Sequence, residues 1–253
     1  LSLEMFERDV QYILDEYLQG FIPEDQFLES ARPWDRYRTD YRPLVEFARA
    51  HDLPVVAANA PRRYINRVTR LGPESLDELP EEALRHLPAL PYPGPSEASE
   101  EQWDELMAQM IEDALAESEE SGEVDGATST PHTVDEEPPE AHVPADDAPP
   151  PTHDTRYALA AQALWDAAMG EAVAAALESH RGALVVHYAG SFHVARGTGI
   201  PERIPEYRAG ARVLTVVLRP VEDIHRWNDD EHEGLGDFVV LTRKTSGTSP
   251  HGM

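Results

Sequence analysis

The stretch ALVVHYAGSFHVARGTGIP, residues 183–201, decides the fold class that this sequence predicts. Leu184, Val185 and Val186 form a short apolar run between two glycines, a pattern typical of a strand that is covered on both faces in a parallel sheet. His193 follows this run and is therefore expected just beyond the carboxyl end of the strand, where open α/β sheets place their ligand crevices. The stretch thus predicts a parallel α/β protein with a functional site at one edge of the sheet.

The N-terminal part of the chain supports the same fold class. Residues 1–6 predict a strand, residues 8–19 carry apolar side chains at helical spacing, and residues 53–59 predict a second strand that ends before Pro61. A strand, a helix and a strand at this spacing indicate a parallel sheet flanked by helices, with a small helical subdomain. Further helices are expected over residues 21–31, 41–52, 62–71, 100–118 and 155–180, and further strands over residues 212–220 and 237–243.

The negative charge is concentrated in the middle of the chain. The net charge is -27, and residues 97–154 contain 19 of the 48 acidic residues and no lysine or arginine. Residues 119–154 combine this charge with many prolines and few apolar residues, which predicts a disordered acidic insertion. The expected organisation is a first α/β part (1–95), an acidic helical segment (96–118), the disordered linker (119–154), a second α/β part (155–243) and a tail (244–253).

Composition excludes several classes of protein. There is no cysteine, so disulfides, cysteine-ligated metals and thiol nucleophiles are excluded. A nucleic-acid partner is disfavoured because no cluster of basic residues is visible. No apolar run approaches the length of about 20 residues that a membrane span requires, and no P-loop, GxSxG or HExxH motif is present.

Polar residues at the expected strand ends are candidates for a site, each with a simpler alternative. Glu4 is a charge inside an apolar strand, although it could also point outward at a sheet edge. Asn59 and Arg62 follow the second strand, where turn formation and a solvated helix start would explain them equally well.

The second half of the chain supplies three more candidates. Gln162 and Asp166 lie four residues apart and project from one face of a helix, which could line a crevice or face solvent. His193 has the best position, with a purely structural loop histidine as the alternative. His187, inside the strand itself, is interpreted as a core residue.

Four separated segments together resemble one known family. They are LEMFERDVQYILDEYLQG (3–20), ARPWDRYRTDYRPLVEFARAHDLPVVAANAPRRY (31–64), AAQALWDAAMG (160–170) and GSFHVARGTGIPERI (190–204). Their order and spacing resemble the ChaN family of bacterial haem-binding proteins, which is related to the Tiki proteases and the erythromycin esterases. The resemblance covers residues 1–72 and 156–218. The family's N-terminal strand with a Gly-Glu-x-His motif is not found, so we expect the chain to begin inside a domain.

The resemblance implies haem as the cofactor, a role in iron or haem uptake, a possible homodimer, and a place in the cell envelope, where many family members are lipoproteins. Tyrosine ligates the haem iron in this family; Tyr157 is the first choice here, with Tyr188 and Tyr92 behind it. The alternative is a metal-dependent hydrolase of the Tiki type, with Glu4 and His193 binding a divalent metal ion. The residues that match recurrent family positions are Glu4, Asn59, Arg62, Gln162, Asp166 and His193, and all of them except Glu4 are expected to serve haem binding.

Overall fold

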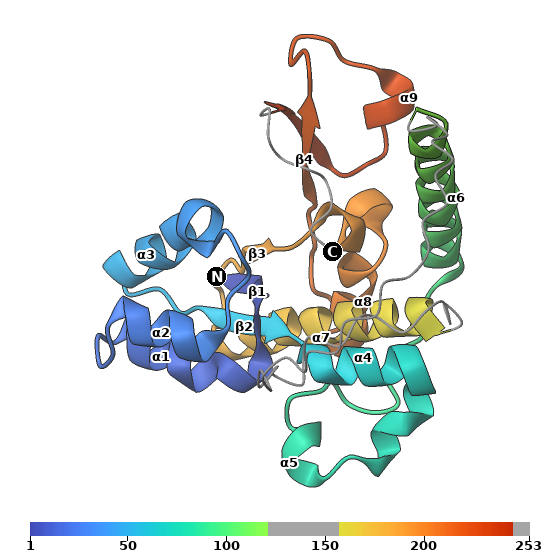
Figure 1. Cartoon of the computed structure of the whole chain (residues 1–253). Coiled ribbons are helices and arrows are strands. Elements are labelled where there is room, and N and C mark those ends of the chain that lie inside the picture. Colours follow the sequence, from blue (N-terminus) through green and yellow to red (C-terminus); the bar gives the residue numbers. More distant parts are fainter. Residues whose placement is uncertain (121–156, 245–253) are drawn as a thin grey trace, which may run out of the picture.

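A three-stranded parallel sheet forms the centre of the protein in the computed structural model, which describes residues 1–120 and 157–244 (Figure 1). Strand β1 (Ser2–Glu7) lies between β2 (Val56–Asn59) and β3 (His187–Tyr188). Ser2 is in register with Val56 on one side and with His187 on the other. All three strands therefore end at the same edge, and the predicted α/β class with parallel strands is confirmed.

The predicted central position of residues 184–186 is wrong. Strand β3 covers only residues 187–188 and has β1 on one side, so it is an edge strand of this sheet. Leu184 is 86% exposed and Val186 is 38% exposed, while Val185 is half-buried. A short apolar run has the same composition at the centre of a sheet and at its edge, because the sequence does not record which strands pair.

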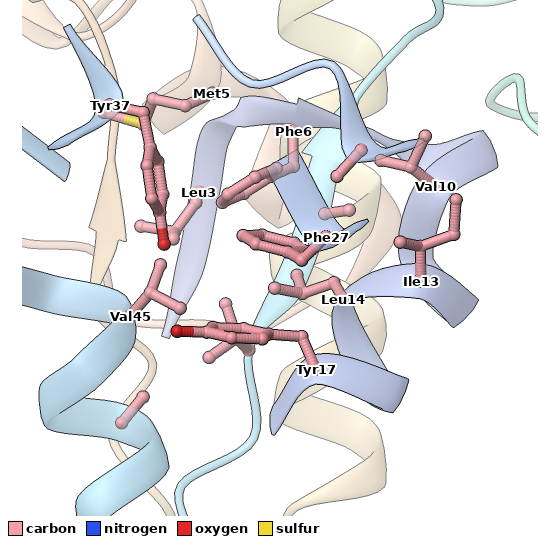
Figure 2. Close-up of a cluster of buried hydrophobic side chains, with 14 residues drawn as sticks. Leu3, Met5, Phe6, Val10, Ile13, Leu14, Tyr17, Phe27, Tyr37 and Val45 are labelled. Atoms are coloured by element: carbon pink, nitrogen blue, oxygen red, sulfur yellow. The ribbon is translucent and has the colours of Figure 1, made fainter. Parts of the chain in front are cut away.

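Helices α1 (Gln11–Leu18), α2 (Glu24–Ala31) and α3 (Arg42–Ala50) lie together beside the sheet and build its main core (Figure 1). In this core the ring of Phe27 stacks on Tyr17 at 4.4 Å and lies 5.7 Å from Phe6 (Figure 2). Aromatic pairs of this kind contribute about 0.5–1.5 kcal/mol beyond their buried area. The core therefore holds the helices firmly against β1.

Helix α7 (Ala158–Ser179) supports the sheet through small side chains. Its Met169 packs with Ala58 of β2 in a second core. Gly170 lets α8 (Ile200–Tyr207) approach, because a Cβ at this position would stand 2.5 Å from the Cβ of Arg203. The alanine-rich segment predicted as a helix is thus a close-packing helix that joins both halves of the chain.

Strands β4 (Val216–Val221) and β5 (Phe238–Arg243) form a separate parallel pair. Both strands were predicted, but the sequence did not indicate that they form a sheet of their own.

No helix in the described ranges is long and apolar enough to cross a membrane. The disorder expected for residues 119–154 falls almost entirely outside the described residues. The remaining elements are η1 (Arg8–Val10), the π-helix η2 (Tyr37–Tyr41), α4 (Arg62–Leu71), η3 (Pro73–Glu78), α5 (Glu81–Leu84), α6 (Glu97–Glu120), η5 (Ser191–His193), η6 (Ala195–Gly197) and α9 (Asp229–His232).

Candidate functional site

Four buried polar side chains meet beside β1, and we call them the strand-end cluster. Glu4 comes from β1, Gln162 and Asp166 from α7, and His193 from the short helical turn after β3. Each of the four is between 5% and 8% exposed. These are four of the residues that the sequence predicted, and almost 190 positions separate the first from the last.

The imidazole of His193 is held between two carboxylates. Its Nδ1 lies 2.6 Å from Asp166 Oδ1, and its Nε2 lies 3.5 Å from Glu4 Oε1. The amide nitrogen of Gln162 is 2.9 Å from the same Nδ1. Since Nδ1 carries one hydrogen at most, we assign it to the shorter contact with Asp166. Because Gln162 and Asp166 are four residues apart on α7, both side chains project from the helix face that contacts His193.

Two glycines fix the loop that carries His193. The backbone N–H of Gly190 donates a hydrogen bond of 2.5 Å to Glu4 Oε2, which ties the end of β3 to β1. Gly199 has φ +65°, and a Cβ there would stand 2.6 Å from the carbonyl oxygen of His193 and 3.1 Å from the Asp166 carboxyl. The loop therefore closes onto α7 only because residue 199 has no side chain.

Burial and charge shift the pKa values of the strand-end cluster in different directions. Burial would lower the pKa of His193, but Asp166 and Glu4 outweigh it and raise this pKa to about 10. Burial opposes the ionisation of Glu4, yet the hydrogen bond and charge of His193 bring its pKa below the usual value. Burial raises the pKa of Asp166. The arrangement favours a protonated His193 that is locked in place.

His187 lies near the strand-end cluster, and the sequence did not identify it as a candidate site residue. Its Nδ1 lies 2.8 Å from the hydroxyl of Ser2, and its Nε2 is buried without a hydrogen-bond partner. Burial is the largest cause that lowers its pKa, to about 4. The contact depends on the pairing of Ser2 with His187, and no local sequence signal reports that register.

Two further predicted residues stay apart from this cluster. Asn59 is buried at the end of β2, and its side-chain oxygen makes no hydrogen bond. Arg62 is exposed at the start of α4, where its backbone N–H donates to Glu7.

The three candidate tyrosines occupy three different places. Tyr157 packs against Gly72 at the start of α7. The hydroxyl of Tyr92 donates to the carbonyl of Ala160. Tyr188 is 36% exposed on β3.

Helix α6 closes the strand-end cluster from outside. The Gln102 side chain donates to the carbonyl of Phe192 and accepts from the hydroxyl of Thr198, and the Trp103 ring meets the edge of Phe192. The cavity left between α6, α7 and the loop measures about 10 Å³, and Gln162 and Asp166 lie in its wall. That volume suits a single water molecule rather than a cofactor.

A larger hollow lies between α2 and α3, at the segment that leads into the π-helix η2. It measures about 380 Å³ and is widely open to solvent. We call it the arginine groove, because three of its lining residues are arginines. The lining consists of Leu28 and residues 32–39.

The metal-binding alternative finds no support in the geometry. Within residues 1–120 and 157–244 no group of three or more histidine, aspartate or glutamate side chains is arranged to hold a metal ion. Glu4 and His193 instead face each other across an ion pair.

The fold and the strand-end cluster define a parallel α/β protein in which buried acidic residues of β1 and α7 enclose a histidine that follows β3. Residues 1–204 match the family model described as "Haem-binding uptake, Tiki superfamily, ChaN". The chain belongs to this family of haem-binding proteins, and the resemblance predicted from its motifs is confirmed.

One solved structure is similar to this chain over most of its length. It is described as "Cofacial heme binding to ChaN of Campylobacter jejuni", with 16% sequence identity and a TM-score of 0.54. The match covers 94% of this chain and 71% of the other. At this identity the likeness supports the fold alone. No curated protein sequence matches the chain.

Proposed function

We propose that this protein binds haem and serves in haem or iron uptake. The observation that carries this function is the family match over residues 1–204. The family description names haem-binding uptake, and the wider fold of a ChaN protein extends over nearly the whole chain.

The described residues offer room for a haem on the surface rather than inside the strand-end cluster. A porphyrin cannot enter a cavity of about 10 Å³, whereas the arginine groove has about 380 Å³ and is lined by guanidinium groups and Trp34. Haem needs such partners, because its propionates are carboxylates and its ring is flat and apolar. The ring of Tyr37, in contrast, is buried in the core. When bound, the haem would supply an iron centre whose properties depend on its axial ligand.

For the strand-end cluster we propose a supporting role near the haem. Both ring nitrogens of His193 face carboxylates, so the ring is not free to ligate iron in this conformation. The ring of Tyr41 lies 6.1 Å from Trp34 of the groove, and burial, followed by the charges of Asp40 and Glu4, raises the pKa of its phenol. Gln162 and Asp166 share this supporting role, and Asn59, Arg62 and Tyr157 remain proposed haem-site residues on the strength of the family resemblance.

A homodimer is also part of the proposal. The related Campylobacter jejuni structure is described by cofacial haem binding, an arrangement in which two haem faces meet. A second copy of this chain would bring a second haem to the same interface. Light scattering with and without haemin measures whether the mass doubles on binding.

The decisive experiment is a titration of the protein with ferric haemin, followed by the Soret absorbance. We expect a saturable shift, and His193→Ala should weaken binding several-fold because the loop that His193 holds would loosen. His142→Ala, a change in the acidic linker of residues 119–154, is the matched control, and this variant should bind haemin as the wild type does. The absence of a saturable shift in the wild type would reject haem binding.

A further inference from the structure

We propose that helix α6 is a removable cover, which opens while the rest of the fold stays intact and then admits small polar solutes to the strand-end cluster. The proposal goes beyond haem binding and does not depend on it. Helix α6 lies at the periphery of the molecule (Figure 1). Together with α7 and the loop that carries His193, it encloses the small cavity whose wall contains Gln162 and Asp166. The position of α6 therefore decides whether solvent reaches these two side chains.

The apolar side chains of α6 are poorly buried. No side chain between residues 97 and 112 is buried, and Trp103, Leu106 and Met107 are only half-buried. Met110 and Ile111 are 39% and 62% exposed. Helix α7, in contrast, buries more than half of its 22 residues. Because helices in proteins are stabilised mainly by the apolar face that they bury, α6 is held to the fold far more weakly than α7.

Several of the contacts that hold α6 in place are polar and accessible to water. The Gln102 side chain bonds to the Phe192 carbonyl at 3.2 Å and to the Thr198 hydroxyl at 2.5 Å. Glu105 forms an ion pair of 2.6 Å with Arg196, and both side chains are more than half exposed. Exposed ion pairs contribute little to stability, and water replaces a neutral hydrogen bond at a small net cost. These contacts position α6 without fixing it firmly.

The charge of α6 also favours its release. Residues 97–112 contain six acidic residues and no lysine or arginine. Glu101 stands four positions from both Glu97 and Glu105, a spacing at which like charges on a helix repel each other. This repulsion destabilises the closed helix and is relieved when the helix opens and frays.

The surface under α6 is polar, so its exposure to water costs little. Thr198 is 5% exposed, and Arg203 also lines the cavity, with its Nε buried and without a hydrogen-bond partner. Opening α6 lets water hydrate these groups, whereas opening α3 or α7 would expose apolar core. The closed cavity of about 10 Å³ has room for a single water molecule, and only an open α6 gives a larger polar solute access to Asp166.

The test uses a thiol as a probe, because the chain contains no cysteine of its own. Thr198→Cys places one thiol under α6, and Ala48→Cys places one in the main core, where Ala48 is fully buried in α3. In native buffer we expect the thiol reagent DTNB to label position 198 about 100-fold faster than position 48, because only global unfolding exposes position 48. Both positions should react more slowly than they do in the urea-unfolded protein.

Val45→Ala separates the opening of α6 from global unfolding. It removes volume from the main core, where Val45 is fully buried, and should speed labelling of position 48 about tenfold or more. Labelling of position 198 should stay within about twofold of its original rate, because the closed and the open state keep the same core.

A second pair of substitutions acts on α6 itself. Trp103→Ala removes the ring that meets Phe192 at 6.0 Å and should speed labelling of position 198 about tenfold. Met110→Ala is the matched control on the same helix and should leave that rate within about twofold, since Met110 is 39% exposed.

Equal labelling rates at positions 198 and 48, both raised by Val45→Ala, would overturn the proposal, because α6 would then open only with the whole fold. Labelling of position 198 as fast as in the unfolded protein would overturn it too, because α6 would then not close. Circular dichroism verifies that each variant is folded. Hydrogen exchange of the wild type is a second measurement that needs no substitution. The amides of residues 97–112 should exchange about 100-fold faster than those of α7, and equal protection of the two helices would contradict a removable α6.

Discussion

The hydroxyl of Tyr37 is a polar group in the aromatic core that has no hydrogen-bond partner. Figure 2 shows it beside Leu3 and Val45, in apolar surroundings. Burial is the main cause that raises the pKa of this phenol. An unsatisfied buried hydroxyl costs about 1–3 kcal/mol. The ring of Tyr37 therefore stabilises the core, whereas its unpaired hydroxyl lowers the stability of the fold.

We therefore expect Tyr37→Phe to raise the melting temperature by several degrees, because it removes the unpaired oxygen and keeps the ring. Tyr17→Phe is the control in the same core: the Tyr17 hydroxyl donates to Glu46, so its removal should lower the melting temperature. Differential scanning calorimetry of both variants checks the pair. A decrease for Tyr37→Phe equal to that for Tyr17→Phe would show that the Tyr37 hydroxyl has a stabilising partner.

At the residue scale, the sequence indicated those site residues whose position follows from a local pattern. Gln162 and Asp166 could be found because helical spacing puts them on one face, and His193 because it follows an apolar run. His187 could not be recognised, since its contact with Ser2 depends on strand register. The left-handed arginines of the groove also lack a signal, because glycine or asparagine is the usual residue in that conformation.

At the scale of the element, helices α7 and α8 pack so closely at Gly170 that this position has no room for a side chain. The Cβ of an alanine at position 170 would stand 2.5 Å from the Cβ of Arg203 and 3.3 Å from backbone atoms of Arg203 and Ile204. Alanine favours a helix over glycine by about 1 kcal/mol, but a backbone neighbour cannot move away as a flexible side chain can. Steric overlap therefore outweighs helix propensity at this position.

The corresponding prediction is that Gly170→Ala destabilises the protein by about 1–3 kcal/mol. Gly94→Ala is the control, because a Cβ at Gly94 would meet nothing within 4 Å. Urea unfolding at neutral pH measures both free energies. Should Gly170→Ala prove as stable as the wild type, α8 must be able to shift on α7, and the two helices are less tightly packed than described.

The positions of single helices and strands along the chain were predicted more reliably than the pairing between strands. Helix α4, with its amphipathic pattern, and the alanine-rich helix α7 appeared close to their expected bounds. The strand pairing differed from expectation, because residues 184–186 precede the edge strand β3 and lie outside it, and because among the described strands β4 pairs with β5 alone. Periodicity reports which side chains one element buries, whereas the order of strands is decided by contacts between distant segments.

At the scale of the whole molecule, two neighbouring histidines make stability depend on pH in opposite senses. The pKa of His193 is raised from 6.5 to about 10 by Asp166 and Glu4, so its stabilising contribution is complete below pH 6.5 and disappears as the pH rises to 10. The pKa of His187 is lowered from 6.5 to about 4 by burial, so its neutral form favours folding above pH 6.5. That contribution disappears as the pH falls from 6.5 to 4. Glu4, with its lowered pKa, adds to the loss in acid, while Asp166 opposes it.

The molecule should accordingly be most stable near pH 6.5 and lose stability on both sides of this value. On the acid side, the shift of His187 corresponds to a loss on the order of 2–3 kcal/mol by pH 4, before the contributions of Glu4 and Asp166 are counted. Unfolding free energies measured between pH 4 and pH 10 test this dependence, and two variants separate its causes. His187→Gln should reduce the loss of unfolding free energy below pH 6.5, and His193→Gln should reduce the loss above pH 6.5, because glutamine does not titrate. If His193→Gln left the alkaline side unchanged, the protonated imidazole between Asp166 and Glu4 would not be the group that the fold stabilises, and its loop would have to be held by the Gly190 and Gly199 contacts alone.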